Sequence, residues 1–196
     1  SCIDDYLESK LKLFSQSRTI CINRGSDRLD RIMEAARSVQ QSRCESGGYI
    51  PEIVTFGTDP GSDYLASDIR SLASDGGCIS FHVRSSAFDD VFEISMHGLF
   101  NVDNALAAIT MTHCLGIPLD SIKAGLKKAR VSGRMEMFTS RKRGFSVIVD
   151  YAHNQMSFET LFRSVKKEFP GRKISIVFGC PGGKAQQRRR ELGTIA

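Results

Sequence analysis

The sequence predicts an α/β fold that contains a parallel βαβ unit. Two continuously apolar segments, Ser146–Asp150 and Lys173–Gly179, have the length and the β-branched content of buried strands. Between them, residues 155–169 carry apolar side chains at helical spacing and stop at a Pro-Gly pair. Strands joined by one helix pair in parallel through a right-handed crossover, so we expect these two strands to be neighbours.

The first part of the chain predicts an alternation of helices and strands. Residues 4–14 have apolar side chains at helical spacing, and Thr19–Asn23 reads as a buried strand. An amphipathic helix is predicted over Ser26–Val39, with Ser26 as its N-cap.

The middle of the chain predicts a strand-rich region followed by two helices. Within residues 52–98, the segments EIVTFG, CISFHVRS and VFEISMHG are separated by Asp, Gly and Ser, which indicates a mostly antiparallel or mixed edge of a sheet. The two helices cover 101–116 and 118–129, and Pro118 opens the second. His113 lies on the apolar face of the first helix without a Cys, Asp or second His, so we expect a packed core histidine.

Composition limits the class of protein. The 196 residues are 41% hydrophobic, which is enough for one large domain or two small ones, and no apolar run approaches the length of a membrane span. The six cysteines form no CxxC pair, so we expect reduced thiols in a cytoplasmic protein rather than a zinc ribbon. The chain starts with Ser1 instead of Met, which indicates a piece of a longer protein.

Charge is distributed unevenly along the chain. Residues 1–122 have a formal net charge of −7, whereas residues 123–196 have +12. A basic second part is typical of proteins that bind phosphate-bearing partners, either nucleotides or nucleic acid, but a solvated basic face gives the same count. The aromatic side chains of this part fall mostly on predicted core faces, which argues against a surface that stacks on bases.

A glycine-rich loop follows the second apolar strand but is not a P-loop. A P-loop has the pattern G-x-x-x-x-G-K-[ST], in which backbone N–H groups hold the phosphates and a hydroxyl reaches Mg²⁺. Here Gly179 and Gly183 are one residue too close, and Ala185 replaces the hydroxyl.

Several polar residues occupy positions where an α/β protein binds ligands. Asp150 and His153 follow the first apolar strand, and Lys184 lies in the glycine loop after the second. The carboxyl ends of parallel neighbours share one edge, so we expect these side chains to face one crevice, with Asp150 near ribose hydroxyls and Lys184 near an anion. Such residues can also serve only to cap helices.

Three other residues have both a structural and a functional interpretation. Arg134 lies at a predicted domain junction, where an arginine can bind phosphate or form an interdomain salt bridge. Asn104 lies one turn inside a helix, where asparagine is unfavourable, so a binding role gains weight. Lys10 lies on an apolar stripe and can either extend its ammonium into water or carry a modification.

The order of these motifs resembles the Mur ligases of peptidoglycan synthesis. YLESKLKLF, GLFNVDNALAA, GRME, VDYAH and VFGCPGGK follow one another over essentially the whole chain. The similarity is closest to the members that add the third residue of the stem peptide. It implies a fragment of the central ATPase domain over 1–131, followed over 132–196 by part of a Rossmann-like C-terminal domain. The family's UDP-binding domain and P-loop are then absent, so we expect this piece alone to be inactive.

The resemblance also implies roles for individual residues. Lys10 matches the lysine that is carbamylated and helps to hold Mg²⁺. The residues that match ATP contacts are Asn104, Arg134, Asp150 and His153. Lys184 and Arg188 match the region near the incoming amino acid, although relatives have GCGGDR where this chain has GCPGGK.

The implied reaction forms an amide bond in two steps. ATP phosphorylates the carboxylate of a UDP-N-acetylmuramoyl-dipeptide to give an acyl phosphate, and the amine of an amino acid then displaces phosphate. Other ligases of the same superfamily, of the folylpolyglutamate or cyanophycin type, remain an alternative, as does a basic nucleic-acid-binding module.

Overall fold

The computed structural model describes residues 3–72, 78–180 and 186–196, which belong to two compact units. The first unit contains Ser1–Ile69, Phe81–Phe92 and Val102–Leu126. The second contains Arg70–Ser80, Glu93–Asn101 and Lys127–Ala196.

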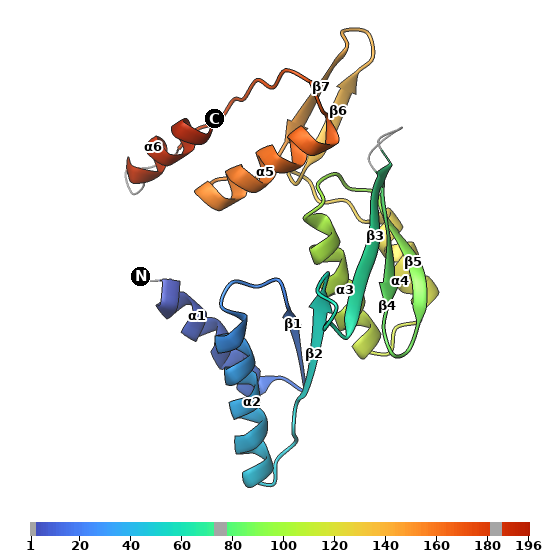
Figure 1. Ribbon diagram of the computed structural model, residues 1–196, viewed down its shortest axis with the longest axis vertical. Helices are drawn as coiled ribbons and strands as arrows, with labels where there is room; N and C mark the ends of the chain where they lie inside the picture. The colour runs from blue at the N-terminus through green and yellow to red at the C-terminus, as the bar shows by residue number, and fades with distance from the viewer. Residues whose placement is uncertain (1–2, 73–77, 181–185) are drawn as a thin grey trace. The chain divides into compact units, whose positions relative to one another are not determined.

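A five-stranded mixed sheet has the order β1-β2-β3-β4-β5 (Figure 1). Its strands are β1 (Thr19–Asn23), β2 (Glu52–Gly57), β3 (Tyr64–Leu72), β4 (Cys78–Arg84) and β5 (Asp89–Ile94). β1 pairs in parallel with β2, and β2 in parallel with β3. The short connection between β4 and β5, closed by a 2.8 Å hydrogen bond from Ser85 N to Phe88 O, allows only antiparallel pairing. The predicted mixed sheet is therefore confirmed.

The sequence pattern predicts no strand at β3, and the composition of this segment explains why. The segment YLASDIRSL is rich in polar residues, and Asp68 has a left-handed backbone with φ of 49°. Its strand conformation depends on pairing with β2 and β4 on either side, which the periodicity of the segment itself does not reveal.

The helices that begin in the first part of the chain lie near the predicted positions, except α2, which begins three residues later and ends six residues later than the predicted Ser26–Val39. They are α1 (Ile3–Leu11), the 3₁₀ helix η1 (Lys12–Gln16), α2 (Leu29–Glu45), α3 (Asn101–Cys114) and α4 (Leu119–Lys128). The predicted N-cap at Ser26 is wrong, because Ser26 N donates to Asn23 O in a turn and α2 begins three residues later, after Arg28 in a left-handed conformation.

Ion pairs join the first two helices. The carboxylate of Asp4 on α1 accepts from Arg28 at 2.6 Å and from Arg31 on α2 at 2.7 Å, and Arg31 also pairs with Glu8. All four side chains are substantially exposed, so these pairs orient the helices and add little stability.

Apolar side chains of the sheet and of the helices form the core of the first unit. Ile20 and Ile22 of β1 pack with Ala36 of α2. Phe81 and Phe92 stack with their ring centroids 6.2 Å apart. The prediction for His113 is confirmed, because its ring contacts Tyr64 and Phe88 and its Nδ1 lies 2.6 Å from the Tyr64 hydroxyl.

The second unit contains a hairpin and two helices. β6 (Glu136–Ser140) pairs antiparallel with β7 (Phe145–Val149), and α5 (Gln155–Glu168) and α6 (Gln186–Ile195) follow. One face of the hairpin carries the exposed apolar side chains of Phe138, Phe145, Val147 and Val149, together with Glu136 and Ser140.

The predicted parallel βαβ unit is not formed. The helix is present as α5, but residues 172–180 form no strand and are largely exposed. A cavity of about 210 Å³ lies among β7, α5 and residues 172–176. A parallel pair is favoured when helices cover both faces of the sheet. Here the apolar side chains on one face of β7 are exposed, so helices do not cover both faces of this strand.

The cysteine side chains form no disulfide in the part of the chain that the structure describes. The cysteines of the described part, Cys21, Cys44, Cys78, Cys114 and Cys180, are free. Burial, followed by the neighbouring Cys114, raises the pKa of Cys21 to about 11.

Within the ranges that the structure describes, every helix is too short or too polar to cross a bilayer.

Replacing Phe81 tests the core of the first unit. Phe81 is 1% exposed, so Phe81→Ala leaves a cavity, and we expect a loss of about 3–5 kcal/mol in the free energy of unfolding. The loss is measured from urea unfolding curves. Val91→Ala is the control, because Val91 is 52% exposed and should change stability by about 0.5 kcal/mol or less. Equal losses for the two variants would contradict this description of the core.

Candidate nucleotide site and a polar edge of the sheet

Three of the predicted site residues lie together in the second unit. Asp150, which directly follows β7, accepts hydrogen bonds from Met135 N at 2.8 Å and from Ala152 N at 2.7 Å. Its carboxylate thereby ties the segment before β6 to the loop after β7. Arg134 and His153 belong to these two segments, so the Asp150 hydrogen bonds bring them to one corner, called here the Arg134 corner (Arg134, Asp150, Tyr151 and His153).

The backbone before β6 has an unusual conformation that presents Arg134. Gly133 has φ of 68°, and Met135 has φ of 48°, a left-handed value that costs a non-glycine residue about 1–2 kcal/mol. Met135 is 2% exposed, and its burial together with the Asp150 hydrogen bond offsets that cost. Arg134, between the two, remains exposed.

Aromatic contacts order the exposed side chains of the corner. The Arg134 guanidinium lies 5.2 Å from the centroid of the Tyr151 ring, a cation–π distance. The rings of Tyr151 and His153 are 4.9 Å apart. The Nδ1 atom of His153 lies 2.9 Å from the Tyr151 carbonyl oxygen, which can only accept, so Nδ1 carries the proton. The other ring nitrogen, Nε2, is then available to a ligand.

The N-terminus of α5 begins directly after His153. Asn154 is its N-cap and forms a capping box with Ser157: Ser157 N donates to Asn154 Oδ1 at 2.9 Å, and Asn154 N donates to Ser157 Oγ at 3.1 Å. The capping box fixes the helix start beside the Arg134 corner. The positive end of the helix dipole there favours an anion.

Two of the other predicted site residues, Asn104 and Lys10, belong to the first unit. Asn104 lies on the exposed side of the first turn of α3. Lys10 is exposed near the end of α1, with its ammonium 5.4 Å from the centroid of the Tyr6 ring. Lys184 falls outside the described residues, and Arg188 belongs to α6, where only its backbone is described.

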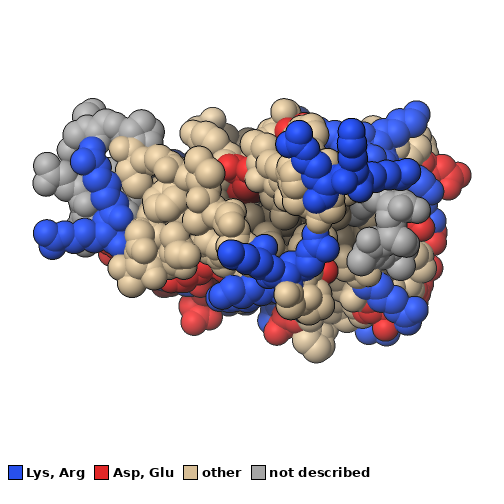
Figure 2. Space-filling view, turned by 90° about the horizontal axis from the view of Figure 1, so that it is seen from above, with Lys and Arg blue, Asp and Glu red and all other residues tan. Residues whose placement is uncertain are grey.

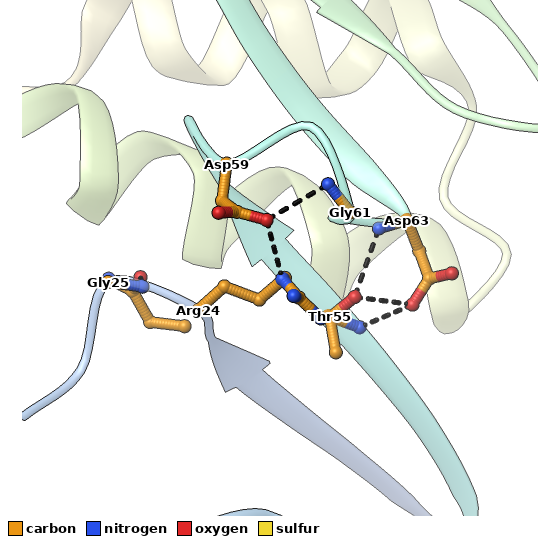
Figure 3. Close-up of polar contacts among 7 residues, drawn as sticks. Arg24, Gly25, Thr55, Asp59, Gly61 and Asp63 are labelled. Atoms are coloured by element: carbon orange, nitrogen blue, oxygen red, sulfur yellow. Dashed lines mark hydrogen bonds and ion pairs between the residues drawn. The ribbon is translucent and has the colours of Figure 1, made fainter. Parts of the chain in front are cut away.

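A second polar cluster, which the sequence analysis does not identify, follows β1 and β2 (Figure 3). Arg24 Nε donates to Asp59 Oδ1 at 3.0 Å, and Gly61 N donates to the same oxygen at 2.9 Å. Asp63 Oδ2 accepts from Thr55 N at 2.8 Å and from Thr55 Oγ1 at 2.6 Å.

The sequence contains a signal for this cluster. The strand TICIN is followed by the polar residues RGSD, and the strand EIVTFG is followed by TDPGSD. Because parallel strands place their carboxyl ends at one edge, two such loops meet there. The contacts fix both loops at the edge where open α/β sheets bind ligands.

The environment of Asp59 favours its charged form. The Gly61 N–H and then the Arg24 guanidinium lower the pKa of the Asp59 carboxyl below its ordinary value. A carboxyl whose pKa is lowered in the folded state stabilises the fold at pH values above its ordinary pKa. This contribution is lost as the pH falls through the folded-state pKa.

Family comparisons assign the two halves of the chain. The Mur ligase middle domain matches residues 1–112, and the Mur ligase, glutamate ligase domain matches residues 133–196. The chain belongs to the Mur ligase family. The Arg134 corner lies in the part of this Mur ligase chain that matches the glutamate ligase domain.

Curated relatives carry ligase names. The UDP-N-acetylmuramoyl-L-alanyl-D-glutamate--2,6-diaminopimelate ligase of Clostridioides difficile is 34% identical over 98% of this Mur ligase chain and 37% of its own length. The UDP-N-acetylmuramoyl-L-alanyl-D-glutamate--L-lysine ligase of Streptococcus sanguinis is 31% identical over 98% of the chain and 35% of its own. The chain thus spans little more than a third of these relatives.

Solved structures share the fold. MurF from Acinetobacter baumannii superposes with a TM-score of 0.66 and 22% identity over 87% of this chain and 34% of its own. A UDP-N-acetylmuramoyl-L-alanyl-D-glutamate--2,6-diaminopimelate ligase gives a TM-score of 0.64 and 24% identity over 100% of this chain and 38% of its own. The mixed α/β architecture is therefore that of Mur ligase domains.

The Asp59 cluster leads to a test by titration. We expect the Asp59 carboxyl, followed by ¹³C NMR, to titrate below its ordinary pKa. Arg24→Ala should raise that pKa only part of the way, because the larger contribution comes from the Gly61 N–H. Arg28→Ala, which removes a partner of Asp4 instead, should leave the titration unchanged. An unshifted Asp59 pKa in the unmodified chain would contradict the cluster.

Proposed function

We propose that this chain is part of an ATP-dependent, cytoplasmic ligase that joins an amino acid to UDP-N-acetylmuramoyl-L-alanyl-D-glutamate in peptidoglycan synthesis. The observation that carries the proposal is the Arg134 corner, where Arg134, Asp150 and His153 lie together beside the start of a helix. The names of the curated relatives support the substrate, and they differ in the amino acid that is added.

In this proposal the Arg134 corner holds the nucleotide. Asp150 has both carboxylate oxygens engaged by backbone N–H groups, but each oxygen retains a lone pair that can accept from a ribose hydroxyl. His153 presents Nε2, and Arg134 presents its guanidinium, to phosphate oxygens. Asn104 contacts the adenine. These groups orient the nucleotide and neutralise charge as phosphate is transferred to the substrate carboxylate.

Lys10 is the proposed Mg²⁺ ligand, as a carbamate. Its side chain is exposed and so accessible to CO₂, and the added group is an oxygen ligand of the kind that Mg²⁺ prefers. Among the described residues, no group of three or more His, Cys, Asp or Glu side chains can hold a metal. Lys10 fits a metal that takes few protein ligands and several from phosphate and water. The ion would supply charge neutralisation at the phosphates.

The proposed domain boundary lies near Ser132, with the central domain over 1–131 and the C-terminal domain over 132–196. The family matches to residues 1–112 and 133–196 support it. Lys184 and Arg188, in the second of these domains, are the proposed contacts of the incoming amino acid.

Substitution of the Arg134 corner tests the proposal in the full-length protein. With ATP, UDP-N-acetylmuramoyl-L-alanyl-D-glutamate and either diaminopimelate or lysine, we expect phosphate release. Arg134→Ala and His153→Ala should each lower kcat/KM by about 10²-fold, because each removes a group that stabilises moving negative charge. Arg143→Ala is the matched control, since Arg143 lies in the exposed β6–β7 turn, and should change kcat/KM less than about twofold. Absence of turnover with both amino acids would sink the proposal.

A separate prediction concerns Lys10. Lys10→Ala should abolish most activity of the full-length protein, because the variant lacks the proposed oxygen ligand. Added formate or acetate should restore part of the activity by supplying a carboxylate at the same place. Lys12→Ala, two residues further along the chain, should retain activity. Full activity of Lys10→Ala would remove the lysine from the proposed metal site.

A further inference from the structure

A cavity of about 910 Å³ in the second unit is lined by three arginines and a buried histidine. We call it the arginine pocket. Its lining includes Arg130, Arg134, Arg141, His97, Glu136 and Phe169. It shares Arg134 with the Arg134 corner, but Asp150, Tyr151 and His153 do not line it.

The positive charge of the arginine pocket is not neutralised within the part of the chain that the structure describes. No salt bridge there joins Arg130, Arg134 or Arg141 to a carboxylate. The Arg130 guanidinium is oriented by its Nη1, which donates to Ala129 O at 2.8 Å. Glu136, the acid of the lining, accepts from Ser132 Oγ at 3.1 Å and from Gly133 N at 2.9 Å. The pocket therefore favours an anion.

Lys and Arg side chains also gather on the face of the molecule seen in Figure 2. The β6–β7 turn has three exposed basic residues in succession, Arg141, Lys142 and Arg143. Of these three, Arg141 alone lines the pocket. A comparison of Arg141 with Arg143 therefore separates a specific contact from the general field of the basic surface.

His97 is held rigidly in the wall of the pocket. It is 7% exposed, and its Nδ1 lies 3.2 Å from Glu168 Oε2, while Glu168 Oε1 accepts from Gly98 N at 2.8 Å. Its ring lies 6.1 Å from that of Phe169. Because Nδ1 faces a carboxylate, it carries the proton. The other nitrogen, Nε2, is buried and has no hydrogen-bond partner among the residues described.

The Nε2 atom has less than 1 Å² of accessible surface, so a ligand in the pocket reaches it only when the pocket wall shifts. A buried polar atom without a partner is costly, so a ligand that supplies one gains affinity. A phosphate group fits either protonation state of the ring: P–OH donates to neutral Nε2, and a protonated Nε2 donates to P–O⁻. Arg130 and Arg141, which the nucleotide proposal does not use, provide planar donors that bind phosphate oxygens in pairs.

The remaining wall of the pocket is apolar. Met96, Val131, Met137 and Phe169 contribute to it, and the cavity volume lies in the range of sites for small organic ligands. Inorganic phosphate would leave this wall uncovered. An organic group attached to the phosphate would bury apolar surface there.

We propose that the arginine pocket binds a phosphomonoester that carries an apolar organic group. The phosphate contacts Arg130, Arg141 and His97 Nε2, and the organic group packs against Phe169 and Met137. This site goes beyond the proposed ligase function, because these phosphate contacts do not include Arg134, Asp150 or His153, which hold the nucleotide in that proposal.

The test is a titration of the 196-residue chain with phenyl phosphate and with inorganic phosphate, followed by NMR of the histidine imidazole C–H signals. We expect saturable shifts of the His97 signals and affinity roughly tenfold higher for phenyl phosphate. Arg141→Ala and Arg130→Ala should each weaken binding at least about tenfold, the effect of losing a charged hydrogen bond. Arg143→Ala should change affinity less than about twofold.

Three results would overturn the proposal. Shifts confined to the His153 signals would place phosphate at the Arg134 corner and leave the ligase proposal standing. Equal weakening by Arg141→Ala and Arg143→Ala would show that only the general basic surface attracts the anion. Equal affinity for the two probes would exclude the apolar part of the site. Arg141 and Arg143 are both exposed turn residues, so loss of the fold does not confuse the comparison.

Discussion

The carboxylate of Asp150 is the interaction on which the second unit depends. It holds the N–H of Met135 on one side and the N–H of Ala152 on the other, and so joins the entry to β6 with the exit from β7. Without it, the left-handed Met135 would lose its hydrogen bond, and Arg134 would lose its fixed position over Tyr151. One acidic side chain thus determines both the backbone path and the presentation of the basic group beside it.

The sequence predicted those parts of the fold that depend on local periodicity. The strand β1, the helices α3 to α5 and the mixed sheet followed from apolar spacing, proline positions and turn residues. The strand β3 was missed, and residues 172–180 were predicted as a strand that does not form. Both errors concern strand pairing, which depends on the partner as well as on the segment itself. β3 pairs despite a polar sequence, and the apolar segment 172–180 stays unpaired.

The candidate site could be predicted by type but not by geometry. The motif DYAH indicated Asp150 and His153, and the structure gives them different tasks: Asp150 fixes backbone, whereas His153 presents a ring nitrogen. No pattern in the sequence indicated that His97 pairs with Glu168, because the two residues are 71 positions apart. The contact between Arg24 and Asp59 was also not predicted. The sequence did show two strands that are each followed by a polar loop, but not which side chains of these loops pair.

The hairpin of β6 and β7 has a consequence for the behaviour of the protein at high concentration. On one face of the hairpin Phe138 lies opposite Val147, and the exposed side chains of Phe145 and Val149 lie two residues on either side of Val147. An exposed apolar surface of this kind favours association with the same surface of a second molecule. The two edge strands of the hairpin also have unpaired backbone N–H and C=O groups that a second molecule can bind. Colloidal stability therefore rests on the neighbouring lysines and arginines, whose mutual repulsion weakens as salt is added.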